Sequence, residues 1–160
     1  MAATGLLSVG ELAPDFELPD QTGDRVSLTG LLGHGALVMF FYPAAMSPGC
    51  TAQSFHFRDL GAEFAELGAS LVGVSQDSVE RQRQFDEANH LGYPLLADVT
   101  GEVCRKYGVA RTGAPARLLP MRRSTCVIAP DRHIMTVVHS ELRMDAHADR
   151  ALAALRHAAS

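Results

Sequence analysis

The segment ALVMFFYPAAMSPGC, residues 36–50, joins a buried strand, a proline-containing loop and the start of a helix. Residues 36–41 form a continuous apolar run of strand length, which is typical of a central strand covered on both faces. Pro43 prevents further regular pairing, so the strand ends there. From Cys50 to residue 67 the pattern is helical, because one apolar stripe contains Phe57, Leu60, Phe64 and Leu67. This order of elements predicts an α/β protein with a cysteine at a strand–loop–helix junction.

The rest of the chain extends this pattern. In chain order, the other expected elements are a hairpin over residues 15–28, a strand over 71–74, a helix capped by Asp77 and continuing to Asn89, a short helix over 101–107, strands over 125–128 and 134–138, and a last helix from Asp145. Strands that alternate with helices and then form an antiparallel pair predict a mixed central sheet with helices on both faces. Glycine and proline are spread evenly, so we expect a single domain over residues 1–160.

The composition excludes several classes of protein. The chain has 160 residues, 47% of them hydrophobic, a formal net charge of −4 and three cysteines. It is too hydrophobic for a disordered chain, and it has no clustered basic patch for nucleic acid. No apolar run reaches the roughly 18–20 residues that span a bilayer, and the N-terminus does not resemble a secretory signal. Three scattered cysteines do not make a disulfide scaffold, so we expect a cytoplasmic protein with reduced thiols.

Cys50 is the best candidate for chemistry. Its loop follows the carboxyl end of a strand, where ligand sites of α/β sheets are found, and a helix N-terminus favours an anion such as a thiolate. Pro48 and Gly49 allow a sharp turn of the backbone. Cys50 also shares the helical phase of Phe57, so its sulfur should point into the protein. The alternative is a small buried residue that happens to start a helix.

Several segments resemble the peroxiredoxin family, in particular its Q-type or bacterioferritin comigratory protein branch. Pro43, Ser47 and Cys50 match the PxxxTxxC signature of that family, with serine in place of threonine. Further similar segments occur in the expected order across nearly the whole chain: residues 10–16, 41–43, 48–51, 57–59, 93–98, 107–109 and 123–128.

The resemblance implies a thioredoxin-like fold with an N-terminal hairpin extension, and an antioxidant peroxidase that uses no metal, haem or other cofactor. Cys50 would be the nucleophile that attacks a peroxide and becomes sulfenic acid. The Ser47 hydroxyl would bond the peroxide and the thiolate in a looser site than threonine gives. Arg123 would supply a fixed positive charge, and Pro43 would shape the pocket. Arg122 is the neighbouring alternative, and strand alternation directs only one of the two arginines inward.

One residue departs from the pattern of that branch. Many Q-type members have a resolving cysteine five residues after the nucleophile, where this chain has Phe55. Cys104 is the better internal substitute because its short helix could unwind, although it also fits a buried apolar stripe. Cys126 lies in an apolar strand, which indicates a core position. We therefore expect a one-cysteine mechanism, with thioredoxin or a low-molecular-weight thiol as reductant, in a monomer or homodimer.

Other functions remain open from the sequence. Oxidation of Cys50 could signal to a partner in a non-enzymatic sensor or binding module, or the chain could be an inactive scaffold. Asp145, His147 and Asp149 could suggest a metal site, but residues two apart on a helix face different directions, which favours a solvated helix start. His56 should point away from Cys50. The long loop over residues 111–117 could border a site or be a surface insertion.

Overall fold

A five-stranded mixed sheet forms the centre of the protein. The computed structural model describes residues 7–110, 121–139 and 143–159. The sheet has the order β5-β4-β3-β6-β7, and its strands are β3 (Leu37–Phe41), β4 (Ser70–Ser75), β5 (Leu95–Ala97), β6 (Ser124–Ile128) and β7 (Ile134–His139). The pairs β3–β4 and β4–β5 are parallel, whereas β3–β6 and β6–β7 are antiparallel. The predicted mixed sheet is confirmed.

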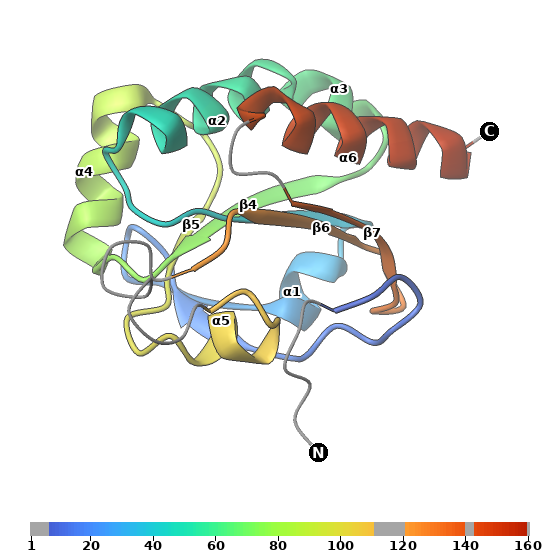
Figure 1. Cartoon of the computed structure of the whole chain (residues 1–160), viewed down its shortest axis with the longest axis horizontal. Coiled ribbons are helices and arrows are strands. Elements are labelled where there is room, and N and C mark those ends of the chain that lie inside the picture. The colour runs from blue at the N-terminus through green and yellow to red at the C-terminus, as the bar shows by residue number, and fades with distance from the viewer. Residues whose placement is uncertain (1–6, 111–120, 140–142, 160) are drawn as a thin grey trace.

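Helices cover both faces of this sheet (Figure 1). One face carries α2 (Pro48–Asp59), α3 (Gly61–Glu66) and α6 (Met144–Ala159). The opposite face carries α1 (Leu28–Leu32) and α5 (Glu102–Lys106), and α4 (Val79–Asn89) contacts β5. The predicted N-terminal hairpin is formed by β1 (Glu17–Pro19) and β2 (Arg25–Ser27), which pair antiparallel. Among the described residues, no helix combines the length and apolar character needed to cross a membrane.

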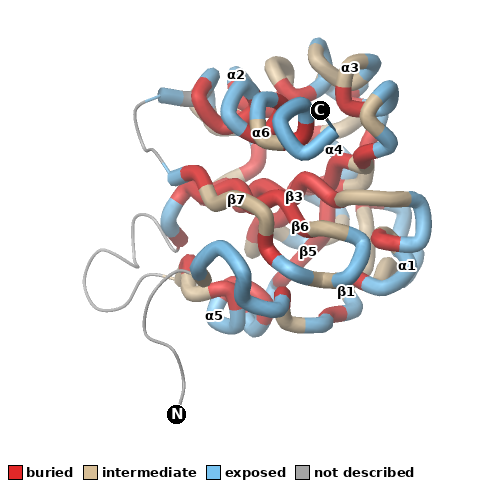
Figure 2. The backbone as a smooth tube through the Cα atoms, turned by 90° about the vertical axis from the view of Figure 1, so that its right-hand side faces the viewer, coloured by how far each residue is buried: buried red, intermediate tan, exposed pale blue. Residues whose placement is uncertain are grey.

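The alternation of side chains along β3 creates two separate cores. Val38, Phe40 and Tyr42 belong to the cluster beneath α2 and α6, whereas Leu37, Met39 and Phe41 belong to the cluster on the opposite face. β3 and β6 are buried along their whole length, and β4 is buried except at Ser70; Figure 2 shows buried backbone in red at the centre of the molecule.

A stacked aromatic pair fixes α2 to the sheet. The rings of Phe40 and Phe57 lie 4.2 Å apart between centroids at an interplanar angle of 10°. Gly73 of the neighbouring strand leaves room for these aromatic side chains, because a Cβ there would come within 3.0 Å of both Phe40 and Tyr42. The helix that begins beside Cys50 is therefore held close to the sheet.

The structure differs from the sequence-based expectations in local details. The helix expected over residues 50–67 is two helices, because at Leu60 the backbone leaves the helical region with φ −91° and ψ 5°. Ser78 caps α4 by accepting from the Arg81 N–H, so the cap predicted at Asp77 is wrong. The short elements α1 and β5 were missed because five and three residues are too few to show a periodicity.

Candidate active site

Cys50 lies in the first turn of α2 and is fully buried. The helix starts with Pro48, and Ser47 is its N-cap residue in an extended conformation. The first helical bond joins the Thr51 N–H to the Ser47 carbonyl oxygen at 2.9 Å. The N–H groups of Gly49 and Cys50 precede this bond, so they have no intrahelical acceptor and direct partial positive charge toward the start of the helix.

The side chain of Arg123 reaches the sulfur of Cys50. Arg123 directly precedes β6 and is 6% exposed, and its Nη2 donates to Cys50 Sγ at 3.2 Å. Its Nη1 donates to Gln53 Oε1, and Gln53 is fully buried. Arg122 is exposed, as the alternation argument requires. A cation, the sulfur and a buried amide therefore form one hydrogen-bonded group.

Gln53 is a member of this group that the sequence motifs do not identify. It lies three residues after Cys50, so both side chains are on the same face of α2. A polar residue on an otherwise apolar, inward-facing stripe is the signal that would have identified it. Since its carbonyl oxygen is used by Arg123, Gln53 orients the guanidinium toward Cys50.

Pro43 and Ser47 lie at the two ends of the loop that leads to Cys50. The Tyr42 N–H donates to the Val74 carbonyl at 3.0 Å, and Pro43, which is buried and lacks an N–H, comes directly after it. The Ser47 hydroxyl donates to the Ala44 carbonyl oxygen at 2.9 Å. The structure thus joins Cys50 to Arg123 and Gln53, while the hydroxyl hydrogen of Ser47 is bonded to the loop itself.

The other two cysteines lie across the sheet from Cys50. All three are free thiols, but Cys50 belongs to the core beneath α2, whereas Cys104 and Cys126 belong to the core on the opposite face. Burial raises the pKa of Cys126 to about 12. Burial, followed by hydrogen bonding to Asp98, raises the pKa of Cys104 well above its usual range. Both are therefore protonated and poorly nucleophilic at neutral pH.

These shifts predict how the two thiols respond to alkylation. In a Cys50→Ser variant treated with iodoacetamide at pH 8, we expect Cys104 and Cys126 to stay essentially unlabelled. The raised pKa favours the thiol until the pH approaches 12, so only about one molecule in 10⁴ has the Cys126 thiolate at pH 8. Peptide mapping measures the labelling, and guanidinium chloride should restore it at both sites. Labelling of the folded variant as fast as the denatured one would contradict the assignment.

His147 and His56 each contact a side chain of another element. His147 is fully buried and its Nδ1 lies 2.8 Å from Thr125 Oγ1, so the expectation of a solvated helix start is wrong at this residue. His56 Nε2 lies 2.8 Å from Asp149 Oδ1 and joins α2 to α6. Within the described part of the chain, no group of three or more candidate ligands could hold a metal ion. The loop over residues 111–117 falls outside the described residues.

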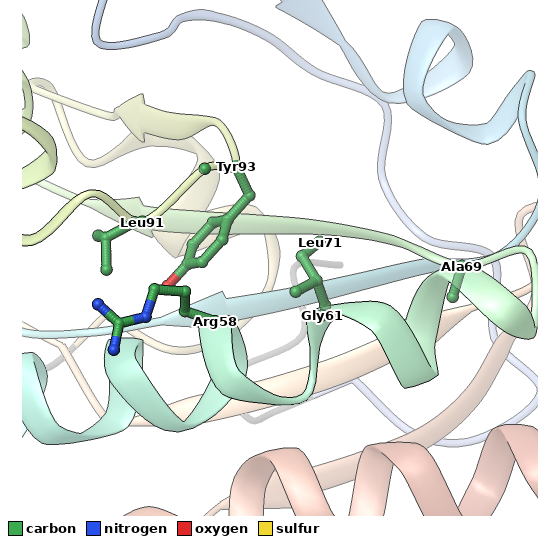
Figure 3. A pocket seen from close by; sticks show the side chains of 7 residues that line it. Arg58, Gly61, Ala69, Leu71, Leu91 and Tyr93 are labelled. Carbon is green, nitrogen blue, oxygen red and sulfur yellow. The ribbon is translucent and has the colours of Figure 1, made fainter.

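A separate pocket of about 300 Å³ lies beside the far end of α2 (Figure 3). The Tyr93 side chain points into this region, and its hydroxyl donates to the Ser54 carbonyl at 2.9 Å. The residues that line the pocket are Arg58, Gly61, Ala69, Leu71, Leu91, Gly92 and Tyr93. This set shares no member with the group around Cys50, so the pocket is distinct from the candidate active site.

Comparison with known proteins identifies the family. The AhpC/TSA family model matches residues 9–137. Peroxidoxin BcpB from Mycobacterium tuberculosis is 51% identical, with a TM-score of 0.90 over 94% of this chain and 97% of that one. The Xanthomonas campestris bacterioferritin comigratory protein, studied for its alkyl peroxide reduction activity, is 30% identical, with a TM-score of 0.84 over 98% and 99% of the two chains.

A curated relative agrees with these structures. Peroxiredoxin Bcp of Escherichia coli strain K12 is 43% identical over 103 residues, which are 64% of this chain and 65% of that protein. The predicted thioredoxin-like peroxiredoxin fold and the Q-type resemblance are thereby confirmed. The chain belongs to the AhpC/TSA family, in its bacterioferritin comigratory protein branch, and is a thiol-dependent peroxidase.

Proposed function

We propose that Cys50 is the nucleophile of this peroxidase. Its thiolate attacks one oxygen of the peroxide, an S–O bond forms as the O–O bond breaks, and the departing oxygen takes a proton to leave as water or an alcohol. The sulfur is oxidised to sulfenic acid and the peroxide is reduced. The observation that carries the proposal is the buried Arg123 guanidinium, whose Nη2 lies 3.2 Å from Cys50 Sγ.

Arg123 acts at two points of this reaction. Before attack, its Nη2 donates to the sulfur and holds the guanidinium beside the position that the peroxide approaches. During attack, the same fixed donor stabilises negative charge on the departing oxygen, without reorganisation at the moment of reaction. Gln53 holds the guanidinium in place for both tasks.

Ser47 and Pro43 complete the proposed site. Because the Ser47 hydroxyl hydrogen is bonded to the Ala44 carbonyl, its oxygen offers lone pairs, so Ser47 accepts a hydrogen bond from the peroxide O–H. Buried Pro43 excludes water from the start of the loop. Serine in place of threonine leaves the hydroxyl more rotational freedom, so we expect a looser site that remains active.

The recycling step uses an external thiol. The thiol attacks the sulfenic sulfur, releases water and forms a mixed disulfide with Cys50. A second thiol then attacks the outer sulfur of this disulfide, so that Cys50 leaves as the free thiol and the two external thiols are joined in a disulfide. Thioredoxin or a low-molecular-weight thiol can supply both equivalents. Support comes from Phe55 in α2 and from the placement of Cys104 and Cys126 across the sheet, where neither can reach Cys50 without large rearrangement.

The proposed substrates are hydrogen peroxide and organic hydroperoxides, since the Xanthomonas campestris relative reduces alkyl peroxides. We place the reaction in the cytoplasm, where thiol reductants are abundant, and in a monomer or homodimer.

A variant without the other two cysteines tests the one-cysteine mechanism. We expect the double variant Cys104→Ser, Cys126→Ser to keep steady-state peroxide turnover within about threefold of wild type. Both residues lie across the sheet from Cys50, so the substitutions leave the contacts of the transition state intact. Turnover is measured with hydrogen peroxide and either a thioredoxin system or excess low-molecular-weight thiol. A double variant that forms sulfenic acid normally but no longer turns over would contradict the mechanism.

A further inference from the structure

Two charged side chains from the segment that follows β4 form hydrogen bonds with the loop between β3 and α2. Asp77 Oδ2 accepts from the Ala45 N–H at 2.7 Å, and Arg81 Nη2 donates to the Ala45 carbonyl oxygen at 3.4 Å. Arg81 Nε lies 3.4 Å from Asp77 Oδ1. One ion pair therefore binds both polar backbone groups of a single loop residue.

A series of hydrogen bonds that begins at Tyr42 holds the Asp77 carboxylate in place. The Tyr42 hydroxyl donates to Gln82 Oε1, and Gln82 Nε2 donates to Ser75 Oγ at 3.0 Å. Ser75 Oγ donates to Asp77 Oδ2 at 2.7 Å, the same oxygen that Ala45 uses. Tyr42, Ser75 and Gln82 are fully buried, so this series of hydrogen bonds fixes the carboxylate to the ends of β3 and β4.

The part of the loop that follows Ala45 has a conformation that needs such support. Met46 has φ 69°, in the left-handed region that L residues rarely adopt, and the residue is 46% exposed. A residue in this region persists where the surrounding structure fixes it. Ser47, the next residue, bonds back to the Ala44 carbonyl. The position of Ser47 relative to Cys50 therefore depends on how Ala45 is held.

We propose that Asp77 and Arg81 are positioning residues for the oxidation of Cys50. They act through Ala45 and hold the loop so that the Ser47 oxygen and the start of α2 face the peroxide that Cys50 attacks. This inference rests on the proposed function of Cys50. Neither residue contacts Cys50 Sγ in the hydrogen bonds of the described residues, so the effect is on geometry.

The experiment compares two reactions of the same sulfur. Oxidation by hydrogen peroxide needs the aligned site, whereas alkylation by iodoacetamide needs the thiolate and an opening to the buried sulfur but no alignment of Ser47 with a peroxide. We expect Asp77→Ala to lower the rate constant for Cys50 oxidation about 10- to 100-fold, because a misplacement of about 1 Å has this effect, while the alkylation rate stays within about threefold. Quenched-flow mass spectrometry measures both reactions, as the gain of one oxygen or one alkyl group.

Further variants separate positioning from folding. Asp77→Asn keeps an oxygen acceptor for Ala45, so it should retain about a third or more of the wild-type oxidation rate. Arg81→Ala removes a half-exposed side chain and should lower oxidation about threefold or more without loss of the fold. Arg83→Ala is the matched control, since Arg83 lies in the same helix but bonds Glu80 and the Gln21 carbonyl, and it should oxidise at the wild-type rate.

The possible outcomes distinguish this inference from the proposed function. Asp77→Ala and Arg81→Ala proteins that oxidise as fast as wild type would overturn the positioning role alone. Equal losses in oxidation and alkylation would also overturn it, since they would indicate a general effect on the thiolate. A wild-type chain in which Cys50 gains no oxygen from hydrogen peroxide would instead contradict the proposed function, and this inference with it.

Discussion

Replacing Cys50 by serine is expected to reduce peroxide consumption to the rate measured without protein, a loss on the order of 10⁴-fold or more. A serine hydroxyl remains protonated at neutral pH, and the thiolate is the form that attacks the O–O bond. Serine is close to cysteine in size, so the packing of α2 against the sheet should persist. The measurement is peroxide consumption with excess thiol reductant, accompanied by circular dichroism to verify the fold.

The matched control for this experiment is the double variant without Cys104 and Cys126, which keeps Cys50 as the chain's one cysteine. It should remain active, whereas Cys50→Ser should be inactive although it retains both other thiols. A Cys50→Ser protein with more than a few per cent of the wild-type rate would assign the chemistry to another residue.

Replacing Arg123 by methionine is expected to have the second-largest effect, a loss of about 10²- to 10³-fold in the rate constant for Cys50 oxidation. Methionine keeps an unbranched apolar stem but is shorter than arginine, and it removes the donor to Cys50 Sγ and the charge that faces the departing oxygen. It also leaves Gln53 Oε1 buried without this donor, so we expect the free energy of unfolding to fall by about 1–3 kcal/mol.

Arg122→Met is the matched control, because it makes the same substitution at the adjacent, exposed position. It should oxidise at the wild-type rate. Arg123→Lys should be intermediate, since lysine keeps the charge but cannot bond Cys50 and Gln53 together with one planar group. Equal losses at positions 122 and 123 would mean that the oxidation rate depends on the overall electrostatic field of the protein. The specific contact of Arg123 with Cys50 would then have no role.

The sequence predicts the α/β arrangement because the relevant signals are local. Residues 36–41 are all apolar and the chain turns at Pro43, so the central strand and its end can be identified without tertiary information. The choice of Arg123 over Arg122 follows from strand alternation and the family motif, and the observed burial agrees with it. These features depend on residues that are close together in the chain.

The parts that escape prediction depend on contacts between distant residues. Asp77 has the pattern of a helix cap, but its carboxylate binds the Ala45 N–H, 32 residues earlier, and Ser78 caps the helix. Gln53 gains its role only when Arg123 is brought to it, 70 residues later in the chain. His147 looks solvated in the sequence because Asp145 and Asp149 stand two residues away on either side, but β6 supplies Thr125 as a buried partner. No local periodicity contains this information.

The most direct test is mass spectrometry of the wild-type protein, under non-reducing conditions, after one equivalent of hydrogen peroxide. We expect one added oxygen on Cys50, trapped as sulfenic acid, and conversion to a mixed disulfide when a low-molecular-weight thiol is added. Cys104 and Cys126 should remain free thiols. A disulfide between Cys50 and either of them, or an oxygen on another residue with Cys50 unchanged, would contradict the account.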